Sequence, residues 1–375
     1  MVCSLRIAAS KVPEWLFLFN HLNFGGESMS NITSLAVDLA KNTFQLHGTD
    51  AKGKIVLKKK ISREKLLEFI VSLKPCNIHM EACGTANYWG RKFKEHGHKV
   101  KLINPRYVTP YVKRNKNDVN DAAGIAAAAR DPDMRFCDVK TEEQQDMQSV
   151  HRIRSLLIQQ RTALANQMRG LLAEYGVVIP QGISYIRSEL PRIFGNNPND
   201  MGGLILGCLM ELYDHFGYLD NKIAAYDKKI EAIFKNNEGC QRLEEIPGIG
   251  VLGATILVSV LGNGGAFKNG RHFAAFLGLT PRQHSSGGKE RILGISKGGD
   301  TYIRTLLVHG ARSVLLRSNK KTDKQSKWIN SLMSRSGYNK TAVALANKIA
   351  RTAWAIVRNG ENYSVNYKPV FLKTA

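Results

Sequence analysis

The sequence predicts an α/β domain followed by a longer, mainly helical region, and three observations support this fold class. Short apolar runs separated by turn residues fill the stretch from residue 34 to residue 103. Residues 141–240 then contain two long stretches whose apolar side chains recur at helical spacing. The last third of the chain carries further helix-length apolar segments broken by glycines. A chain of 375 residues is long enough for two or three domains, each with its own core.

The chain is strongly basic. Its 54 Lys and Arg side chains outnumber 31 Asp and Glu, which gives a net charge of +23 and a pI near 9.8. Residues 241–375 alone hold 21 basic against 6 acidic side chains. Such a balance is typical of proteins that bind nucleic acid through its phosphates. We therefore expect a nucleic-acid partner, gripped mainly by the last third of the chain.

Cysteine usage and hydropathy further limit the classes of protein to which the chain can belong. The 6 cysteines are scattered without a CxxC pair, so neither a disulfide framework nor a zinc finger is predicted, and a reducing cytoplasm fits. The longest apolar run, Val251–Leu261, falls short of the roughly 20 residues that span a bilayer, so no membrane partner is expected. Residues 1–28 lack the basic segment and cleavage site of a signal peptide. We expect them to be a non-structural leader, with Met29 as a candidate natural start.

The first domain, residues 29–140, is predicted to alternate strands and helices. Strands are expected at 34–39, 43–48, 55–61, 77–81 and 99–103, and helices at 62–71, 86–96 and from 118 onward. The first three strands form an antiparallel meander. This order is that of the ribonuclease H fold, in which acids from the first strand, the fourth strand and a later helix meet at one end of the sheet.

Four acids occupy those positions. Asp118 and Asp121 are one turn apart on one face of a helix, in the first turn, where backbone N–H groups are free and negative charge is tolerated. Taken alone, this stretch is more typical of an N-capping Asp with a solvated acidic first turn. Asp38 and Glu81, however, each end a strand-like segment. Four carboxylates brought together would bind a divalent cation, Mg²⁺ or Mn²⁺, for phosphodiester chemistry.

Residues 141–240 are predicted to form an antiparallel helical coiled-coil arm. The first helix has no Gly or Pro until Gly170, and a Gly/Pro/Asn-rich connection, residues 176–203, separates it from the second. This arm is a candidate spacer or dimerisation element. The polar face of the first helix carries Arg152, Arg154, Arg161 and Arg169. These arginines are either a solvated surface or a stripe that follows phosphates, and Arg161 and Arg169 are candidate nucleic-acid contacts.

The last domain, residues 241–375, is expected to open with a helix-hairpin-helix-like turn. In Pro247-Gly248-Ile249-Gly250 the glycines would let backbone N–H groups approach a phosphate, although many helix-joining turns have this composition. Further along, Ser286 precedes two glycines and is surrounded by basic side chains that suit a phosphoryl transition state; the alternative is an ordinary flexible loop. The basic candidates for nucleic-acid binding here are Arg282, Lys289, Arg291, Lys297 and Arg304.

From residue 31 to residue 360 the sequence resembles the DEDD-type insertion-sequence transposases, the insertion-sequence one-ten family, whose kin include the Piv DNA invertases. The resemblance rests on short motifs spread along the chain: Val37-Asp38 with Lys41, Glu81-Ala82-Cys83-Gly84, residues 116–122 (KNDVNDA), Gln160-Arg161, residues 166–172 (NQMRGLL), residues 278–282 (GLTPR), Ser286-Gly287 and Lys297-Gly298-Gly299. All four acidic positions and the Ser-Gly pair match. The leader is the one part outside the resemblance.

The resemblance implies a RuvC-like domain, a coiled-coil linker and a C-terminal transposase domain with a catalytic serine. Asp38, Glu81, Asp118 and Asp121 would bind the metal, and Ser286 would be the nucleophile. Double-stranded DNA would be the substrate, and some members are guided by an RNA that the element encodes. Since strand exchange needs two active sites, a homodimer or homotetramer is expected. Two alternatives stay open: a metal-dependent, structure-selective nuclease without a covalent intermediate, and a degenerate copy that only binds nucleic acid.

Overall fold

The structure is a computed structural model and describes residues 31–113, 117–197 and 201–364. The chain divides into two compact units between Val139 and Lys140, and each is described by itself. The expected leader, residues 1–28, and Lys116 of the acidic motif lie outside the described residues.

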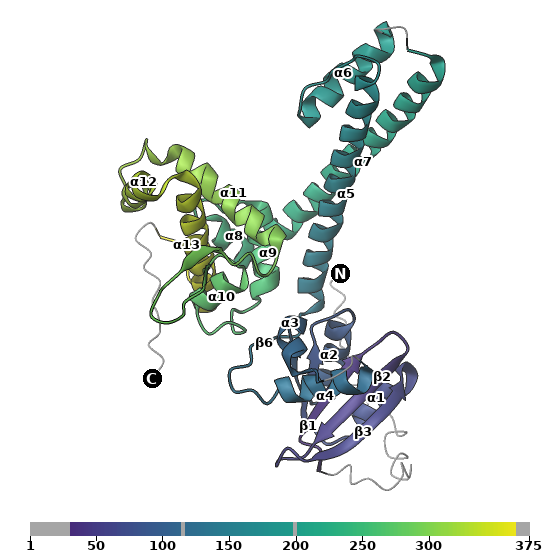
Figure 1. Ribbon diagram of the computed structural model, residues 1–375, viewed down its shortest axis with the longest axis vertical. Coiled ribbons are helices and arrows are strands. Elements are labelled where there is room, and N and C mark those ends of the chain that lie inside the picture. Colours follow the sequence, from purple (N-terminus) through teal and green to yellow (C-terminus); the bar gives the residue numbers. More distant parts are fainter. Residues whose placement is uncertain (1–30, 114–116, 198–200, 365–375) are drawn as a thin grey trace, which may run out of the picture. The chain divides into compact units, whose positions relative to one another are not determined.

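The first unit is built on a six-stranded mixed sheet with the strand order β3-β2-β1-β4-β5-β6 (Figure 1). β1 runs antiparallel to β2 and parallel to β4, and β5 runs parallel to β4. The strands are β1 (Ser34–Leu39), β2 (Thr43–Thr49), β3 (Ile55–Ser62), β4 (Asn77–Glu81), β5 (Lys99–Ile103) and β6 (Phe136–Cys137). The predicted α/β class of this part is confirmed, and β6 is the one strand that was not expected.

Helices cover both faces of this sheet because its central strands are apolar on both sides. Leu35 and Val37 of β1 pack against α1 (Arg63–Val71) and α2 (Ala86–Glu95) in one buried cluster. Ala36, between them, belongs to a second cluster with α3 (Pro105–Val108) and α4 (Asp118–Ala128). Successive side chains of a strand point to opposite faces. Asp38 therefore shares the face of Ala36, which α4 covers.

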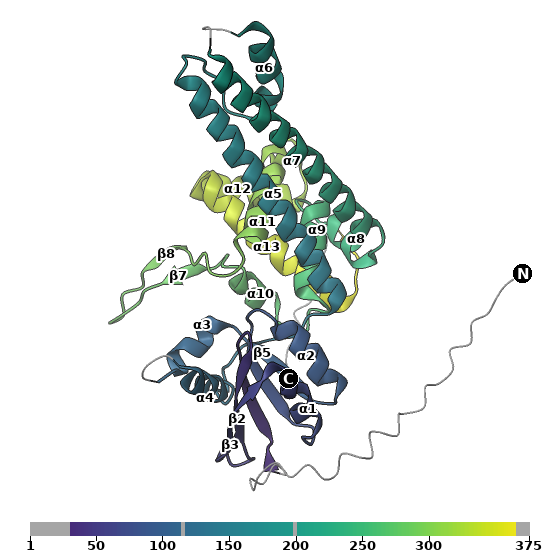
Figure 2. The same ribbon diagram turned by 90° about the vertical axis from the view of Figure 1, so that its right-hand side faces the viewer.

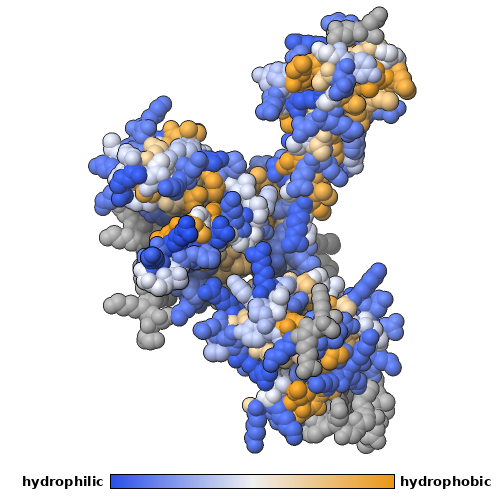
Figure 3. Space-filling view, in the orientation of Figure 1, coloured by the Kyte–Doolittle hydropathy of each residue, from blue (hydrophilic) through white to orange (hydrophobic). Residues whose placement is uncertain are grey.

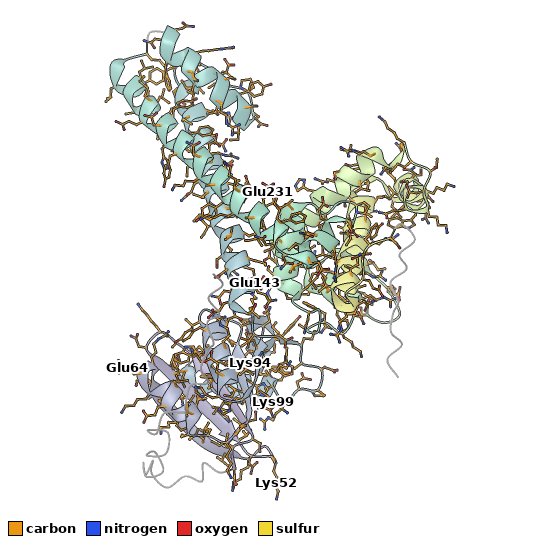
Figure 4. The ribbon with its side chains drawn as sticks, turned by 180° about the vertical axis from the view of Figure 1, so that it is seen from behind. Lys52, Glu64, Lys94, Lys99, Glu143 and Glu231 are labelled. Atoms are coloured by element: carbon orange, nitrogen blue, oxygen red, sulfur yellow. The ribbon has the colours of Figure 1, made fainter. Side chains whose placement is uncertain are left out.

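The second unit begins with an antiparallel pair of long helices, α5 (Glu142–Ala173) and α7 (Gly203–Lys235), which project from the remaining helices as an arm (Figure 1). Ion pairs join them: Arg154 contacts Asp227 and Arg161 contacts Asp220, so residue numbers rise along one helix as they fall along the other. At the base of the arm, the Asn237 amide donates to Glu143, which is labelled in Figure 4.

The connection between these helices contains a third helix, α6 (Ile183–Asn196), which the sequence did not predict. Its buried side chains Ile186, Leu190 and Ile193 have helical spacing, but the surrounding Gly, Pro and Asn residues hid the pattern. They pack with α5 and α7 in a small core at the tip of the arm. Apolar side chains stay exposed there, Val178 at 83% and Leu204 at 86%, and Figure 3 shows hydrophobic surface toward this tip.

The rest of the second unit is mainly helical, as predicted, around one apolar core. Its helices are α8 (Glu238–Glu244), α9 (Val251–Leu261), α10 (Gly270–Phe276), α11 (Thr301–Ser318), α12 (Lys324–Ser336) and α13 (Tyr338–Asn359). Between α10 and α11 the chain forms a two-stranded hairpin, β7 (Pro281–Gln283) and β8 (Ile292–Ile295), which extends away from the helices (Figure 2). Within the described ranges, no helix is long and apolar enough to cross a membrane.

Candidate functional site

Asp38 and Glu81 lie at the same edge of the sheet. Val37 and Met80 are paired in the parallel strands β1 and β4, and the two acids follow these residues. Both are half-buried. Burial raises the pKa of the neighbouring Cys83 thiol, and the charges of Glu81 and Asp38 raise it further. The two carboxylates therefore share one local environment, as the sequence predicted from the positions at which their strands end.

The other two acids stand in the first turn of α4. The N-cap is Asn117, whose side chain accepts a hydrogen bond from the Asn120 backbone N–H at 2.8 Å. Asp118 and Asp121 follow the cap, the first exposed and the second half-buried. An N-capping role for Asp118, the alternative reading of this stretch, is therefore wrong. The acids are left to complement the free N–H groups of the helix start or to bind a cation.

Close packing fixes α4 on the sheet. Ile125 and Ala128 are fully buried against Ala36 and its neighbours. A Cβ atom on Gly124 would lie 2.7 Å from a methyl carbon of Val112, so glycine is needed for the loop before α4 to cross the helix this closely. The Asp118–Asp121 turn is thus held over the same face of the sheet as Asp38.

The donor chemistry of the four acids fits a hard cation, because Mg²⁺ and Mn²⁺ prefer carboxylate oxygens. Asp38 and Glu81 would supply two of these oxygens from adjacent strands. In the part of the chain that the structure describes, no three His, Cys, Asp or Glu side chains lie close enough together to hold a metal ion. Convergence of all four acids on a metal remains a prediction.

Ser286 stands at the tip of the β7–β8 hairpin. It pairs with Lys289 across a two-residue turn, in which the Lys289 N–H donates to the Ser286 carbonyl at 3.1 Å. Gly287 and Gly288 form the turn with φ values of +55° and +76°, which is the conformation that two-residue hairpin turns require. No contact lies within 4 Å of either glycine's Cβ position. The expected Ser-Gly-Gly loop is therefore an ordered hairpin turn with open space around it.

The two serines of the tip differ in their partners. The Gln283 amide donates to the Ser285 hydroxyl at 2.9 Å, so Ser285 takes part in the hairpin's own hydrogen bonding. Within the described residues, no hydrogen bond engages the Ser286 hydroxyl. Around the tip, the basic candidates Arg282, Lys289, Arg291 and Lys297 are all exposed. A polyanion can therefore reach Ser286 without displacing protein contacts.

Arg304 lies at the base of the β7–β8 hairpin and has a structural role there. Its guanidinium donates to the carbonyls of Leu277 and Gly298 at 3.2 and 3.1 Å, which ties the end of α10 to the loop leading into α11. Glycines allow this crossing, since a Cβ on Gly299 would lie 1.9 Å from the Phe276 carbonyl oxygen. A role for Arg304 in nucleic-acid binding stays a prediction; its contacts in the structure anchor the base of the hairpin.

Gly248 and Gly250, the glycines of the helix-hairpin-helix-like turn, differ as well. Gly248 has φ +96°, and a Cβ there would lie 3.0 Å from the Gly310 carbonyl oxygen of α11. Packing therefore explains this glycine without a ligand. Gly250 is the N-cap of α9 and has nothing within 4 Å of its Cβ position. Of the two, Gly250 is the one that a phosphate can approach.

The two arginines proposed from α5 also have partners. Arg161 donates to Asp220 of α7 at 2.6 Å, and Arg187 of α6 contacts the other oxygen of the same carboxylate. Arg169 donates to the carbonyls of Pro180 and Gly182 and thereby holds the chain after α5. For either side chain to bind a phosphate, it would first have to leave these bonds. Their nucleic-acid role remains a prediction.

The sequence did not predict the buried polar cluster at the base of the arm. His151 of α5 is 1% exposed and forms 2.9 Å hydrogen bonds with the hydroxyls of Tyr302 and Thr255. Burial, with a smaller effect from Arg154, lowers its pKa to about 4, so the imidazole is neutral. Beside it lies a pocket of about 180 Å³ lined by α5, α9 and the start of α11. The sequence indicates this cluster only weakly. His151 is a single histidine on the inward face of a helix whose most prominent sequence feature is its arginines.

Comparisons with known proteins agree with these features. The sequence model of the Transposase IS116/IS110/IS902 family matches residues 240–327, and that of the DEDD-type IS110 transposase domain matches residues 35–177. The chain is 45% identical over 336 residues to the transposase for insertion sequence element IS1111A of Coxiella burnetii, covering 90% of this chain and 92% of that protein. It is 43% identical over 328 residues to a probable family 20 transposase of Pseudomonas aeruginosa, covering 87% and 97%.

More distant similarity extends to a pilin gene-inverting protein of Moraxella lacunata, which is 24% identical over 275 residues, with 68% of this chain and 74% of that protein covered. Both family models describe transposases, and two named transposases match this chain over most of their length: the chain is a transposase. It belongs to the IS116/IS110/IS902 family.

Proposed function

We propose that this protein is the transposase of an insertion sequence and that it cuts and rejoins double-stranded DNA through Ser286 and the four acids. The observation that carries the proposal is the Ser286 turn: an exposed, unengaged hydroxyl among basic side chains in a chain of a transposase family. Transposases cut and rejoin DNA, and a serine that attacks a phosphodiester supplies a way to keep each cut end attached.

The proposed chemistry is a transesterification. The Ser286 oxygen forms a bond to phosphorus, the bond from phosphorus to the departing sugar oxygen breaks, and that oxygen takes up a proton while the serine hydroxyl loses one. Because a phosphoserine retains the energy of the broken bond, the strand can be resealed without another energy source. Arg282 and Lys289 would offset the charge of the phosphoryl group through charge-assisted hydrogen bonds.

The acids would act as cation ligands. Asp38 and Glu81 would hold the cation from the sheet, and Asp118 and Asp121 from the start of α4. Mg²⁺ or Mn²⁺ bound there would polarise the scissile phosphate and increase the acidity of the attacking hydroxyl. A neutral serine is a weak nucleophile near pH 7, which is why the reaction needs such assistance.

The partners follow from the same proposal. The DNA ends of the element and its target are the substrates, an RNA guide encoded by the element is a further candidate partner, and the location is a reducing cytoplasm. Two DNA ends need two active sites, so a homodimer or homotetramer is proposed. The exposed apolar side chains at the arm tip, including Val178 and Leu204, support the arm as the contact between copies.

A denaturing gel tests the mechanism. With labelled DNA carrying the element ends, wild-type protein and Ser285→Ala should yield a protein–DNA adduct that survives denaturant, while Ser286→Ala should yield none and still bind DNA. Ser285→Ala is the matched control because it removes the same hydroxyl one residue away. An adduct mapped to Ser285 would refute the assignment of the nucleophile. Cleavage by the wild type without any adduct would favour the second candidate, a metal-dependent nuclease that uses water.

A further inference from the structure

Helix α10 packs on α13 (Figure 1), and three basic side chains that are not among the candidates named so far lie at this contact. The two helices approach closely: a Cβ on Gly270 would lie 2.9 Å from the carbonyl oxygen of Arg351. Arg271 follows at the start of α10. Lys348 and Arg351 are three residues apart on α13, which places them on neighbouring turns of one face. We call Arg271, Lys348 and Arg351 the α10–α13 patch.

The charges of the patch act on one another. Burial lowers the pKa of Arg351, and the nearby Arg271 lowers it further. Burial likewise lowers the pKa of Lys348, with a second contribution from Arg351. The Lys348 ammonium lies 4.9 Å from the ring centroid of Trp328, which holds it in place. Like charges held near one another disfavour their own charged forms, and an anion placed over them relieves this cost.

The surrounding sequence supplies little negative charge. Residues 301–360 contain 12 Lys and Arg and a single acid, Asp323. That acid is used as the N-cap of α12, where it accepts hydrogen bonds from the backbone and the hydroxyl of Ser326. Helices α10 and α13 contain no acid at all. A concentration of one sign of charge on packed helices is the usual footprint of a phosphate backbone.

The patch is also next to the base of the Ser286 hairpin. Asn347, the neighbour of Lys348, donates from its side chain to the Leu279 carbonyl at 3.3 Å, and Leu279 lies two residues before β7 begins. A nucleic-acid strand that reaches the hairpin can therefore continue over α13. The patch is thus placed to hold the backbone at the base of the hairpin without taking part in the reaction.

We propose that Arg271, Lys348 and Arg351 form a phosphodiester-backbone site that holds nucleic acid at the base of the Ser286 hairpin. This inference deepens the proposed function and rests on it. The contacts are to phosphates, so binding is independent of base sequence. Duplex DNA and a folded RNA both carry this chemistry, and the experiment distinguishes them.

The test compares two double variants of the full chain. Arg271→Gln/Lys348→Gln removes two patch charges and leaves Arg351, which is packed against α10. Arg317→Gln/Lys320→Gln removes two exposed charges at the end of α11 and is the matched control for net charge. Dissociation constants for a random-sequence DNA duplex and for an RNA hairpin are measured between low and physiological salt. Melting midpoints equal to that of wild type show that both variants fold.

For the ligand that uses the patch, the slope of log affinity against log salt should fall by about 0.9 per phosphate contact on a duplex, so by nearly 2 in the patch variant, with the control unchanged. A change confined to DNA or to RNA identifies the ligand. Equal slopes for wild type and the patch variant, or an equal loss in the control, would overturn the inference. The covalent Ser286–DNA adduct is measured separately, at low salt. If wild type forms no adduct, the proposed function is refuted, whereas the salt slopes still decide whether the patch binds nucleic acid.

Discussion

Gly310 in the middle of α11 provides the sharpest prediction about the helical unit. A Cβ added there would lie 1.8 Å from the Gly248 carbonyl oxygen and 2.9 Å from its carbonyl carbon. Both obstacles belong to the backbone of the turn before α9, so neither can move by rotating a side chain. Gly310→Ala must push α11 away from that turn by more than 1 Å, on the order of the shortfall from van der Waals contact.

The magnitude follows from the cost of overpacking, which is about 1–3 kcal/mol for an inserted carbon in a well-packed interior. Because the obstacle is backbone, we expect Gly310→Ala to lower the free energy of unfolding by about 3 kcal/mol, the upper end of this range. For a unit of this size, the melting midpoint should fall by about 6–12 °C. The control is Gly170→Ala in α5, where nothing lies within 4 Å of the Cβ position. There, relief from the entropic cost of a helical glycine should stabilise by up to about 1 kcal/mol.

The assay is thermal and urea unfolding of the full chain, followed by tryptophan fluorescence. Trp328 and Trp354 lie in α12 and α13 and report on the helical unit. A midpoint for Gly310→Ala equal to that of wild type would show that the Gly248–Gly310 approach is not as close as the structure has it. A loss in Gly170→Ala as large as that in Gly310→Ala would show that any added methyl is harmful, and the steric argument would fail.

Three further predictions concern charge. Asp118→Asn should abolish strand cleavage in Mg²⁺ with an unchanged melting midpoint, because it removes a ligand charge from an exposed position; wild-type cleavage rates would refute the metal-site proposal. The His151 pKa falls from 6.5 to about 4 on folding, so its contribution to stability is complete above pH 6.5 and is lost as the pH falls toward 4. Urea unfolding should therefore show wild type losing about 2–3 kcal/mol more than His151→Gln across that range, and parallel curves would contradict this. Arg161→Gln should lower the melting midpoint by breaking the Asp220 ion pair, and a changed salt slope for DNA binding would instead place Arg161 at the phosphates.

The arm determines where the chain can be divided to test nucleic-acid binding by its last third. A piece that begins at Gln241 carries the basic last third of the chain but lacks the arm. In the structure, Gln148 of α5 donates to the Ser259 carbonyl of α9 at 3.1 Å, and His151 contacts Thr255 of the same helix. Cutting at residue 241 would expose that side of α9. A piece that begins at Lys140 keeps the cover and is the better test.

Local patterns determined much of the first unit. Alternating apolar residues and turn residues predicted the first five strands, and the acids at the ends of β1 and β4 could be placed at one sheet edge because parallel neighbours bring equivalent ends together. The helical nature of residues 141–173 and 203–235 followed from spacing, and for the first of these helices also from the lack of Gly and Pro before Gly170. These features depend on residues near one another in the chain, so the sequence contains them directly.

Tertiary structure decided the features whose cause lies far away in the chain. Gly248 is explained by the approach of Gly310, and Arg304 by carbonyls at the end of α10. The hydrogen bond of His151 to Tyr302 is visible only in the folded structure. A single histidine in a helix has no sequence pattern that identifies its partner. The Ser286 turn needed both: its two glycines indicated a loop, but only the pairing of β7 with β8 made that loop a tight turn at the tip of an exposed hairpin.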